Sequence, residues 1–103
     1  MKKGILLHEA ADDVGVAAMD LIAGEEVEAV TLEGKPVAQL KLVEDIPLGH
    51  KVAMRDLDAE KRIQEYGRTI GRAVTQISSG ALVHVHNLKS LRWVASESKV
   101  LVE

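Results

Sequence analysis

The sequence contains no cysteine and almost no aromatic residues. Of its 103 residues none is Phe, one is Trp (Trp93) and one is Tyr (Tyr66). Without cysteine the chain has no disulfide framework, no thiolate metal site and no cysteine nucleophile, which is typical of a protein in a reducing cytoplasm. A core without Phe is built from Val, Leu, Ala, Ile and Met, so it lacks the large burial that each aromatic ring brings. Such a domain gains stability when a partner covers part of its surface.

Two further absences narrow the function. Thirteen Lys and Arg against sixteen Asp and Glu give a net charge of −3, and basic clusters are short pairs such as Lys2-Lys3, so a nucleic-acid-binding face is not expected. No run approaches the roughly 20 apolar residues of a membrane span. The apolar run Ile5-Leu6-Leu7 is too short for the core of a signal peptide. We therefore expect a cytoplasmic protein with no nucleic-acid or membrane partner.

The chain has the length of one domain, which we place at residues 1–103. Short apolar or alternating runs separated by turn residues predict a mostly β fold. The turn at 33–36 joins two alternating runs, so a hairpin is expected there. Only residues 56–66 show weak helical character, so we expect at most one or two short helical turns. The predicted strands cover residues 4–7, 14–19, 26–32, 37–43, 50–55, 62–66, 69–76 and 82–86, with a last run at 91–94 or 100–102.

An internal echo supports the β prediction. Residues 16–27 (VAAMDLIAGEEV) match residues 52–63 (VAMRDLDAEKRI) at an offset of 36 residues. Repetition of this kind usually marks a structural unit used twice, although a chance match in a chain rich in Val, Ala and Leu is the alternative. In both copies an Asp starts a bend, and we expect Asp20 and Asp56 to form turns through their side chains. The acidic pairs Asp12-Asp13 and Glu25-Glu26 are expected to be solvated surface.

Three motifs in the second half resemble the altronate and galactarate dehydratase family. Residues 46–53 (Ile-Pro-Leu-Gly-His-Lys-Val-Ala) are similar to the Ile-Pro-x-Gly-His-Lys-Val-Ala stretch of that family's N-terminal region. Residues 66–73 (Tyr-Gly-Arg-Thr-Ile-Gly-Arg-Ala) resemble its Tyr-Gly-x-x-Ile-Gly-x-Ala stretch, and residues 83–87 resemble its His-Val-His-Asn motif. The motifs follow the family's order with similar spacing, which makes the resemblance specific for the family but not for a substrate.

The resemblance implies a fold, a reaction and a partner. The fold is a small SAF-type β-clip domain with short strands and hairpins. The reaction is a β-elimination: a base removes the proton α to a carboxylate, a divalent metal (iron in the family) stabilises the resulting charge, and the β-hydroxyl leaves as water. In the fused enzymes a much larger domain follows this module, whereas two-subunit relatives such as sulfolactate sulfo-lyase encode it as a separate small polypeptide. A chain ending at Glu103 implies a large catalytic partner that shares the metal, and a homo-oligomer is also compatible with the sequence.

The histidines of the last motif are the first candidate site residues. If residues 82–86 form a strand, His84 and His86 point to the same face, roughly 6–7 Å apart, and can share a metal, a carboxylate or a substrate. A pair of exposed histidines on an edge strand is the alternative. Asn87 falls on the opposite face or in the next turn, where its amide is available to a substrate.

The other two motifs supply the remaining candidates. His50 follows a proline–glycine turn and suits a general base or a ligand, or it is an ordinary surface residue. Gly67 and Gly71 are either turn glycines or a close approach to a substrate carboxylate that Arg68 or Arg72 pairs. Tyr66 is equally compatible with a core side chain whose hydroxyl reaches the rim. The predicted roles are catalytic for His50 and His86, metal-binding for His84 and His86, and substrate-binding for Lys51, Arg68 and Asn87.

These residues are too few for a complete active site. The leading hypothesis is therefore the small subunit of a sugar-acid hydro-lyase that is inactive alone and lends histidines to a cleft shared with a large subunit. The first alternative is the small subunit of a sulfo-lyase that eliminates sulfite from sulfolactate. The second is a non-catalytic SAF module that binds a sugar acid or serves assembly.

Overall fold

The computed structural model describes residues 1–93 and 99–101, with side chains described as far as Ser90. Within that part the chain is built from strands, and no residue is helical. The helical turn considered for residues 56–66 is absent: Leu57 forms an isolated bridge, a turn follows, and a strand begins at Arg62. The strands are β1 (Lys3–Leu7), β2 (Val14–Ala17), β3 (Glu26–Thr31), β4 (Pro36–Lys41), β5 (Lys51–Ala53), β6 (Arg62–Glu65), β7 (Arg68–Ala73), β8 (Leu82–Val83), β9 (Leu88–Trp93) and β10 (Lys99–Leu101).

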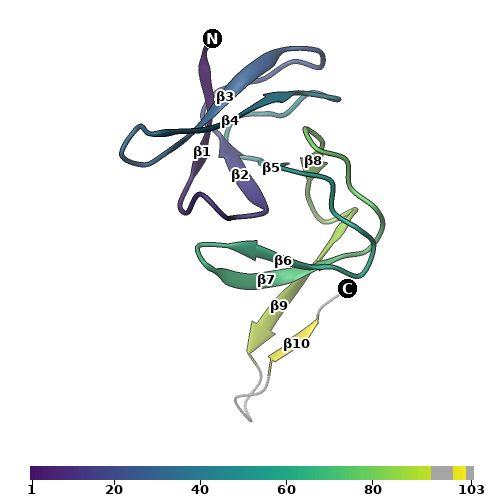
Figure 1. The fold of residues 1–103 in the computed structure, drawn as a ribbon. Helices are drawn as coiled ribbons and strands as arrows, with labels where there is room; N and C mark the ends of the chain where they lie inside the picture. Colours follow the sequence, from purple (N-terminus) through teal and green to yellow (C-terminus); the bar gives the residue numbers. More distant parts are fainter. Residues whose placement is uncertain (94–98, 102–103) are drawn as a thin grey trace.

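The strands form two sheets, which Figure 1 shows one above the other. The six-stranded sheet has the order β4-β3-β1-β2-β5-β8 and the four-stranded sheet the order β10-β9-β7-β6. All strand pairs described are antiparallel except β1 with β3. The hairpin predicted at 33–36 is confirmed as the β3–β4 connection, and the predicted mostly β fold is confirmed with it. The last predicted run corresponds to β9 and β10, whereas Val94 and Val102 lie outside the described residues. Among the described residues no helix is long and apolar enough to cross a membrane.

The repeated sequence is a repeated structure. Leu21 bridges Ile46, and Leu57, which lies 36 residues after Leu21, bridges Ile77 in the same antiparallel manner. Each bridge joins two turns, so the fold contains a first turn pair (residues 20–24 with 45–49) and a second turn pair (residues 56–60 with 76–80). The predicted repeat is therefore a real structural unit. Each copy also contains a second turn, at residues 45–49 in the first copy and 76–80 in the second, which the match between residues 16–27 and 52–63 does not include.

The repeated aspartates act across each turn pair. The Asp20 carboxylate accepts a hydrogen bond from the Leu48 amide at 2.8 Å, and the Asp56 carboxylate accepts one from the Ser79 amide at 2.9 Å. Both residues thus fix turns, as predicted, but each fixes the opposite turn of its pair and not its own. A carboxylate that bonds a backbone N–H holds two distant chain segments together in each unit.

The core divides into two clusters of buried apolar residues. The first cluster lies within the larger sheet and its turn pair, and the second lies where the larger sheet meets the smaller one. Aliphatic side chains supply both clusters, as the absence of Phe requires. The first contains Ile5, Leu7, Ala17, Leu21, Val27, Ala29, Leu40, Leu42, Ile46, Val52 and Met54, and the second contains Val14, Ala53, Leu57, Ile63, Ala73, Ile77, Ala81 and Val83.

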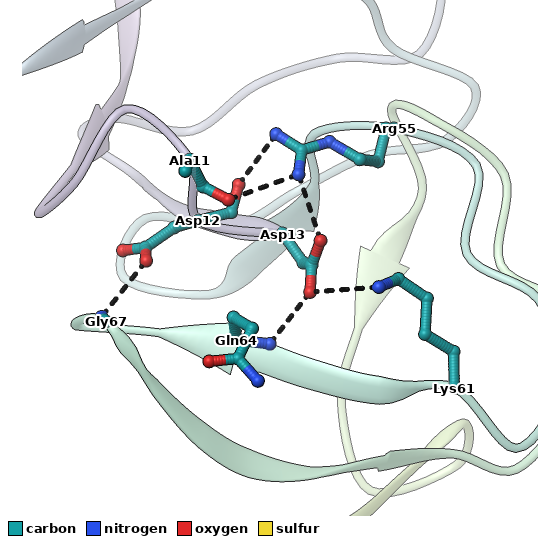
Figure 2. Close-up of polar contacts among 7 residues, drawn as sticks. All are labelled: Ala11, Asp12, Asp13, Arg55, Lys61, Gln64 and Gly67. Atoms are coloured by element: carbon teal, nitrogen blue, oxygen red, sulfur yellow. Dashed lines mark hydrogen bonds and ion pairs between the residues drawn. The ribbon is translucent and has the colours of Figure 1, made fainter.

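Two aspartates expected on the surface are buried between the sheets. Asp12 and Asp13 are each only 2% exposed, so the prediction of solvated surface was wrong for this pair, whereas Glu26 is exposed as expected. Asp12 accepts hydrogen bonds from the backbone amides of Tyr66 (2.9 Å) and Gly67 (3.2 Å), at the tip of the β6–β7 hairpin. Asp13 accepts one from the Gln64 amide at 2.9 Å and donates its own amide to the Gln64 carbonyl at 2.9 Å. These bonds fasten the β1–β2 turn to the hairpin (Figure 2).

Cations compensate the buried charge of Asp13. The Arg55 guanidinium lies 3.0 Å from one carboxylate oxygen, and the Lys61 ammonium lies 3.6 Å from the other (Figure 2). Arg55 also donates to the Ala11 and Asp12 carbonyls, at 3.2 and 3.1 Å. A buried carboxylate is stable only when such partners satisfy it, which explains why a polar pair can occupy this position. We call the contacts of Asp12 and Asp13 with the hairpin the aspartate clasp.

Candidate functional site

The structure brings two of the three predicted histidines together. In the β5–β8 pair Lys51 lies opposite Val83, so the residues just beyond, His50 and His84, lie at adjacent strand ends. Their ring centroids are 5.3 Å apart and the rings are tilted by 54°. His50 is half-buried and His84 is exposed, so both rings remain reachable from outside. The motifs at 46–53 and 83–87 therefore lie side by side at these strand ends.

His84 and His86 do not lie on one face of a strand, as side-chain alternation predicted. Strand β8 ends at Val83, and residues 84–87 form a turn, so the argument that His84 and His86 share one strand face was wrong. His86 is exposed in this turn, next to Val85, which is 79% exposed. The short strand is imposed by Asn87, whose side chain ties the turn back onto β8. The predicted roles of His86 in catalysis and in metal binding stay predictions.

Asn87 is a structural residue of this turn. Its side-chain oxygen accepts a hydrogen bond from the His84 amide at 2.9 Å, and its amide group donates to the Leu82 carbonyl at 2.8 Å. The residue is 6% exposed. An Asx-type arrangement of this kind fixes the turn and with it the direction of the His84 side chain. The predicted contact of Asn87 with a substrate stays a prediction.

Lys51 lies beside a buried carboxylate that the sequence analysis did not single out. Its ammonium is 3.9 Å from Glu65 Oε1, and the Glu65 side chain is 3% exposed. Burial raises the pKa of the Glu65 carboxyl; the Lys51 charge opposes this, and the Asp12 charge adds to it. The signal was present in the sequence, because Glu65 follows the core residue Ile63 by two positions and so points to the same face of β6. Lys51, half-exposed, stays a predicted substrate ligand whose charge is partly balanced by Glu65.

The hairpin tip presents Tyr66 to the surface. Tyr66 and Gly67 have φ values of 59° and 71°, so the β6–β7 connection is a two-residue turn with both residues left-handed. The Tyr66 ring is 46% exposed and meets the His8 ring edge-on at a centroid distance of 4.0 Å, so Tyr66 is not a core side chain. The nearby Glu65 charge raises the pKa of the Tyr66 hydroxyl, and burial and the Asp12 charge act in the same direction. His8, in the turn after β1, was not predicted to lie here.

Gly71 and Arg72 of the β6–β7 hairpin have structural partners, whereas Arg68 is exposed. A Cβ on Gly71 would lie 2.1 Å from the Lys89 carbonyl oxygen, so the close packing of β7 against β9 requires a glycine at this position. This packing explains Gly71 without a contact to a substrate. Arg72 pairs with Glu60 at 2.6 Å. Arg68 is exposed at the start of β7, and its predicted role in binding a substrate carboxylate stays a prediction.

The described residues do not form a complete metal centre. Within residues 1–93 and 99–101, no group of three or more His, Asp or Glu side chains is placed to hold a metal ion. The two rings of His50 and His84 are the only imidazoles that a ring contact brings together in this part of the chain. Imidazole is a suitable ligand for divalent iron and zinc. These two rings fit part of such a site.

Comparison with known proteins gives a consistent result. The family described as "Altronate/galactarate dehydratase SAF domain" matches residues 2–91. The (2R)-sulfolactate sulfo-lyase subunit alpha of Chromohalobacter salexigens is 36% identical over 94 residues, which cover 90% of this chain and 100% of that protein. Altronate dehydratase of Bacillus subtilis is 34% identical over 90 residues (87% of this chain, 17% of the enzyme), and that of Escherichia coli is 36% identical over 86 residues (84% and 16%). The chain therefore spans the whole of one relative but only about a sixth of the two dehydratases.

Proposed function

The chain belongs to the altronate/galactarate dehydratase SAF domain family, and on this premise we propose that it is the small subunit of a lyase acting on a hydroxy acid. In this proposal a large dehydratase-like polypeptide completes the active site. The small share of the dehydratases that the chain matches supports a larger partner. The few titratable groups at the histidine pair support it too, because a β-elimination needs more functional groups than these.

The observation that carries the proposal is the contact between His50 and His84. The two residues lie 34 positions apart in the sequence, yet their ring centroids are 5.3 Å apart at the ends of β5 and β8. Imidazole is the side chain that most often serves as a general base, so one ring can accept the proton that lies α to a substrate carboxylate. The second ring can hold the first in place or bind the same substrate. Lys51 and Arg68 supply cations that can pair with the carboxylate.

A divalent metal, iron by the family resemblance, would stabilise the negative charge that develops on the substrate. His84, the member of the pair with a predicted metal-binding role, is the residue that would hold it, together with ligands from the large subunit, and this leaves His50 as the base. His86, on the exposed turn after β8, is the further candidate ligand from the sequence analysis.

Two substrates fit this proposal. A sugar acid such as altronate or galactarate would lose water, as the names of the two altronate dehydratases and of the family suggest. A sulfolactate would lose sulfite, and one observation favours this second candidate: the sulfo-lyase subunit alpha is matched over 100% of its length. The sulfo-lyase thus has a subunit of about the same length as this chain.

The test is reconstitution with the large dehydratase-like polypeptide encoded nearest to this chain. The complex is expected to release either water from altronate or galactarate, or sulfite from sulfolactate, and the small chain alone is expected to do neither. The double variant His50→Ala, His84→Ala should lower kcat/KM by roughly 10²- to 10⁴-fold, because a general base or a metal ligand is lost. The single variant His86→Ala is the matched comparison, since His86 lies in the same turn as His84 without a ring contact to His50.

Three results would contradict the proposal. Activity of the isolated chain would exclude a shared active site. Full activity of the double variant would favour the non-catalytic assembly module. A larger loss of kcat/KM in His86→Ala than in the double variant would indicate that the site is formed by His84 and His86, the pair predicted from the sequence.

A further inference from the structure

The two turn pairs provide an internal control for the surface of this protein. Their backbones match hydrogen bond for hydrogen bond: Gly49 donates to the Ala17 carbonyl and Gly80 to the Ala53 carbonyl, each at 2.9 Å. The same holds on the other side of each turn, where Gly24 donates to Leu42 and Glu60 to Ala73, both at 2.8 Å. Any difference between exposed side chains at matching positions is therefore not required by the turn geometry.

The exposed side chains do differ, and in one direction. Met19, directly before the first turn pair, is 37% exposed, and Ile22 and Leu48 within it are 59% and 61% exposed. The matching positions of the second turn pair carry Arg55, Asp58 and Ser79. Polar residues at these positions are compatible with the turns, so the apolar ones in the first pair do not serve folding. Exposed apolar residues that gather in one place usually mark an interaction site.

Leu48 and Val85 flank the histidine pair in the sequence, and hydrogen bonds across the first turn pair link Leu48 to the other apolar residues. The Asp20 carboxylate holds the Leu48 amide, which places Leu48 beside the segment that carries Met19. The Asp45 carboxylate holds the Ala23 amide at 2.9 Å, which places Ile22 against the same turn pair. Two residues beyond Leu48, His50 contacts His84, and Val85 next to it is 79% exposed. The second turn pair has Ala81 where the first has His50, so the functional histidine and the apolar side chains occur on the same unit.

We propose that Met19, Ile22 and Leu48 at the first turn pair, together with Val85 in the turn after β8, form the face that docks on the large dehydratase-like subunit. This inference rests on the proposed function, and it adds which surface makes the contact. The occupant is argued from the relatives. In the two altronate dehydratases the matching segment is only 17% and 16% of a longer chain, so in both of them this module is part of a much larger polypeptide. Docking through this face would bring the histidine pair to the centre of the contact, where water is excluded and hot-spot residues are most effective.

The test replaces the apolar residues by those that the second turn pair already carries. The double variant Ile22→Asp, Leu48→Ser should fold normally, because Asp58 and Ser79 occupy the matching positions. Its affinity for the purified large polypeptide, measured by calorimetry with the full chain, should fall at least about tenfold. Leu32→Ser is the matched control: Leu32 is 57% exposed, but it lies at the end of β3 in the hairpin with β4, on the opposite side of the sheet order from β8. Its affinity should stay within about twofold of the wild type.

The outcomes separate this inference from the proposed function. If the wild-type chain binds the large polypeptide and the double variant binds equally well, the docking face is wrong and the proposed function stands. If the wild-type chain does not bind the large polypeptide at all, both are overturned. If the wild-type chain forms a dimer in sedimentation that the double variant abolishes, while binding of the large polypeptide is unaffected, the occupant of this face is a second copy of the chain and the inference is overturned.

Discussion

The two core clusters of this small protein hold their parts of the fold by different means. The first cluster consists mainly of large aliphatic side chains, such as Ile5, Leu7 and Ile46. The second contains three alanines among its eight residues, and two buried aspartates and a buried glutamate border it. Alanines bury little apolar area, so the attachment of the smaller sheet relies more on hydrogen bonds and compensated charges. The comparison teaches that buried charge matters more for the attachment of the smaller sheet than for the core of the larger one.

The largest effect is expected from breaking the aspartate clasp. Asp13→Ala removes the acceptor of the Gln64 amide and leaves Arg55 and Lys61 without their common partner. We expect the free energy of unfolding of the isolated chain to fall by about 2–3 kcal/mol in urea denaturation. Asp13→Asn retains one acceptor oxygen, so its loss should be smaller. A loss for Asp13→Ala below about 0.5 kcal/mol would show that apolar burial alone holds the smaller sheet.

A smaller and nearly equal effect is expected from the two repeated aspartates. Asp20→Ala and Asp56→Ala each remove one hydrogen bond from an exposed carboxylate to a turn amide, Leu48 in the first pair and Ser79 in the second. Each should lower the free energy of unfolding by about 0.5–1 kcal/mol. The matching geometry predicts that the two values agree within error. Thermal unfolding of both variants side by side checks this, and a difference of more than about 1 kcal/mol would mean that the two units are not energetically equivalent.

The smallest effect is expected at Glu65 and depends on pH. Burial raises the pKa of this carboxyl in the folded protein, so the folded state keeps its proton to higher pH than the unfolded state does. The stability that this group contributes is therefore present below its ordinary pKa and is lost as the pH rises through the raised value. Glu65→Gln cannot lose a proton, so we expect its Tm to exceed that of the wild type by no more than a few degrees at neutral pH. The difference should disappear near pH 4.

The control for this pH series is Glu25→Gln. A hydrogen bond from Lys2 and one from the Ile22 amide lower the pKa of the exposed Glu25 carboxyl, so its contribution is present above the ordinary pKa and is lost as the pH falls. The Glu25→Gln variant should therefore be less stable than the wild type at neutral pH, the opposite direction from Glu65→Gln. Two variants with the same sign would contradict the assignment of Glu65 as the destabilising buried charge.

Much of the fold was predictable from local patterns. The alternating runs at 26–32 and 37–43 with a turn between them gave β3, β4 and their hairpin, because side-chain alternation is a property of the strand itself. The run at 82–86 was predicted too long, since the Asn87 side chain bonds the chain back onto itself and ends β8 at Val83. Residues 82–86 by themselves do not indicate that the Asn87 side chain will end the strand. For this reason the prediction that His84 and His86 share one strand face was wrong.

The candidate site was predictable in its residue types and only partly in its geometry. His50 and His84 were both singled out, but their contact depends on the register of β5 with β8, which joins segments about 30 residues apart. Asp12 and Asp13 looked like solvated surface because a pair of acidic residues usually is. Their burial follows from cations and backbone amides that come from distant segments, at Arg55, Lys61 and the β6–β7 hairpin.

The sequence alone determined the aliphatic core, the short strands, the repeated turn unit and the family, because all of these are written in neighbouring residues or in motifs of fixed spacing. The tertiary structure alone decided which histidines meet, that Glu65 lies beside Lys51, and that the first turn pair exposes apolar side chains where the second exposes polar ones. The physical reason is that these facts depend on strand register and on burial. Both arise only when segments far apart in the chain have packed together.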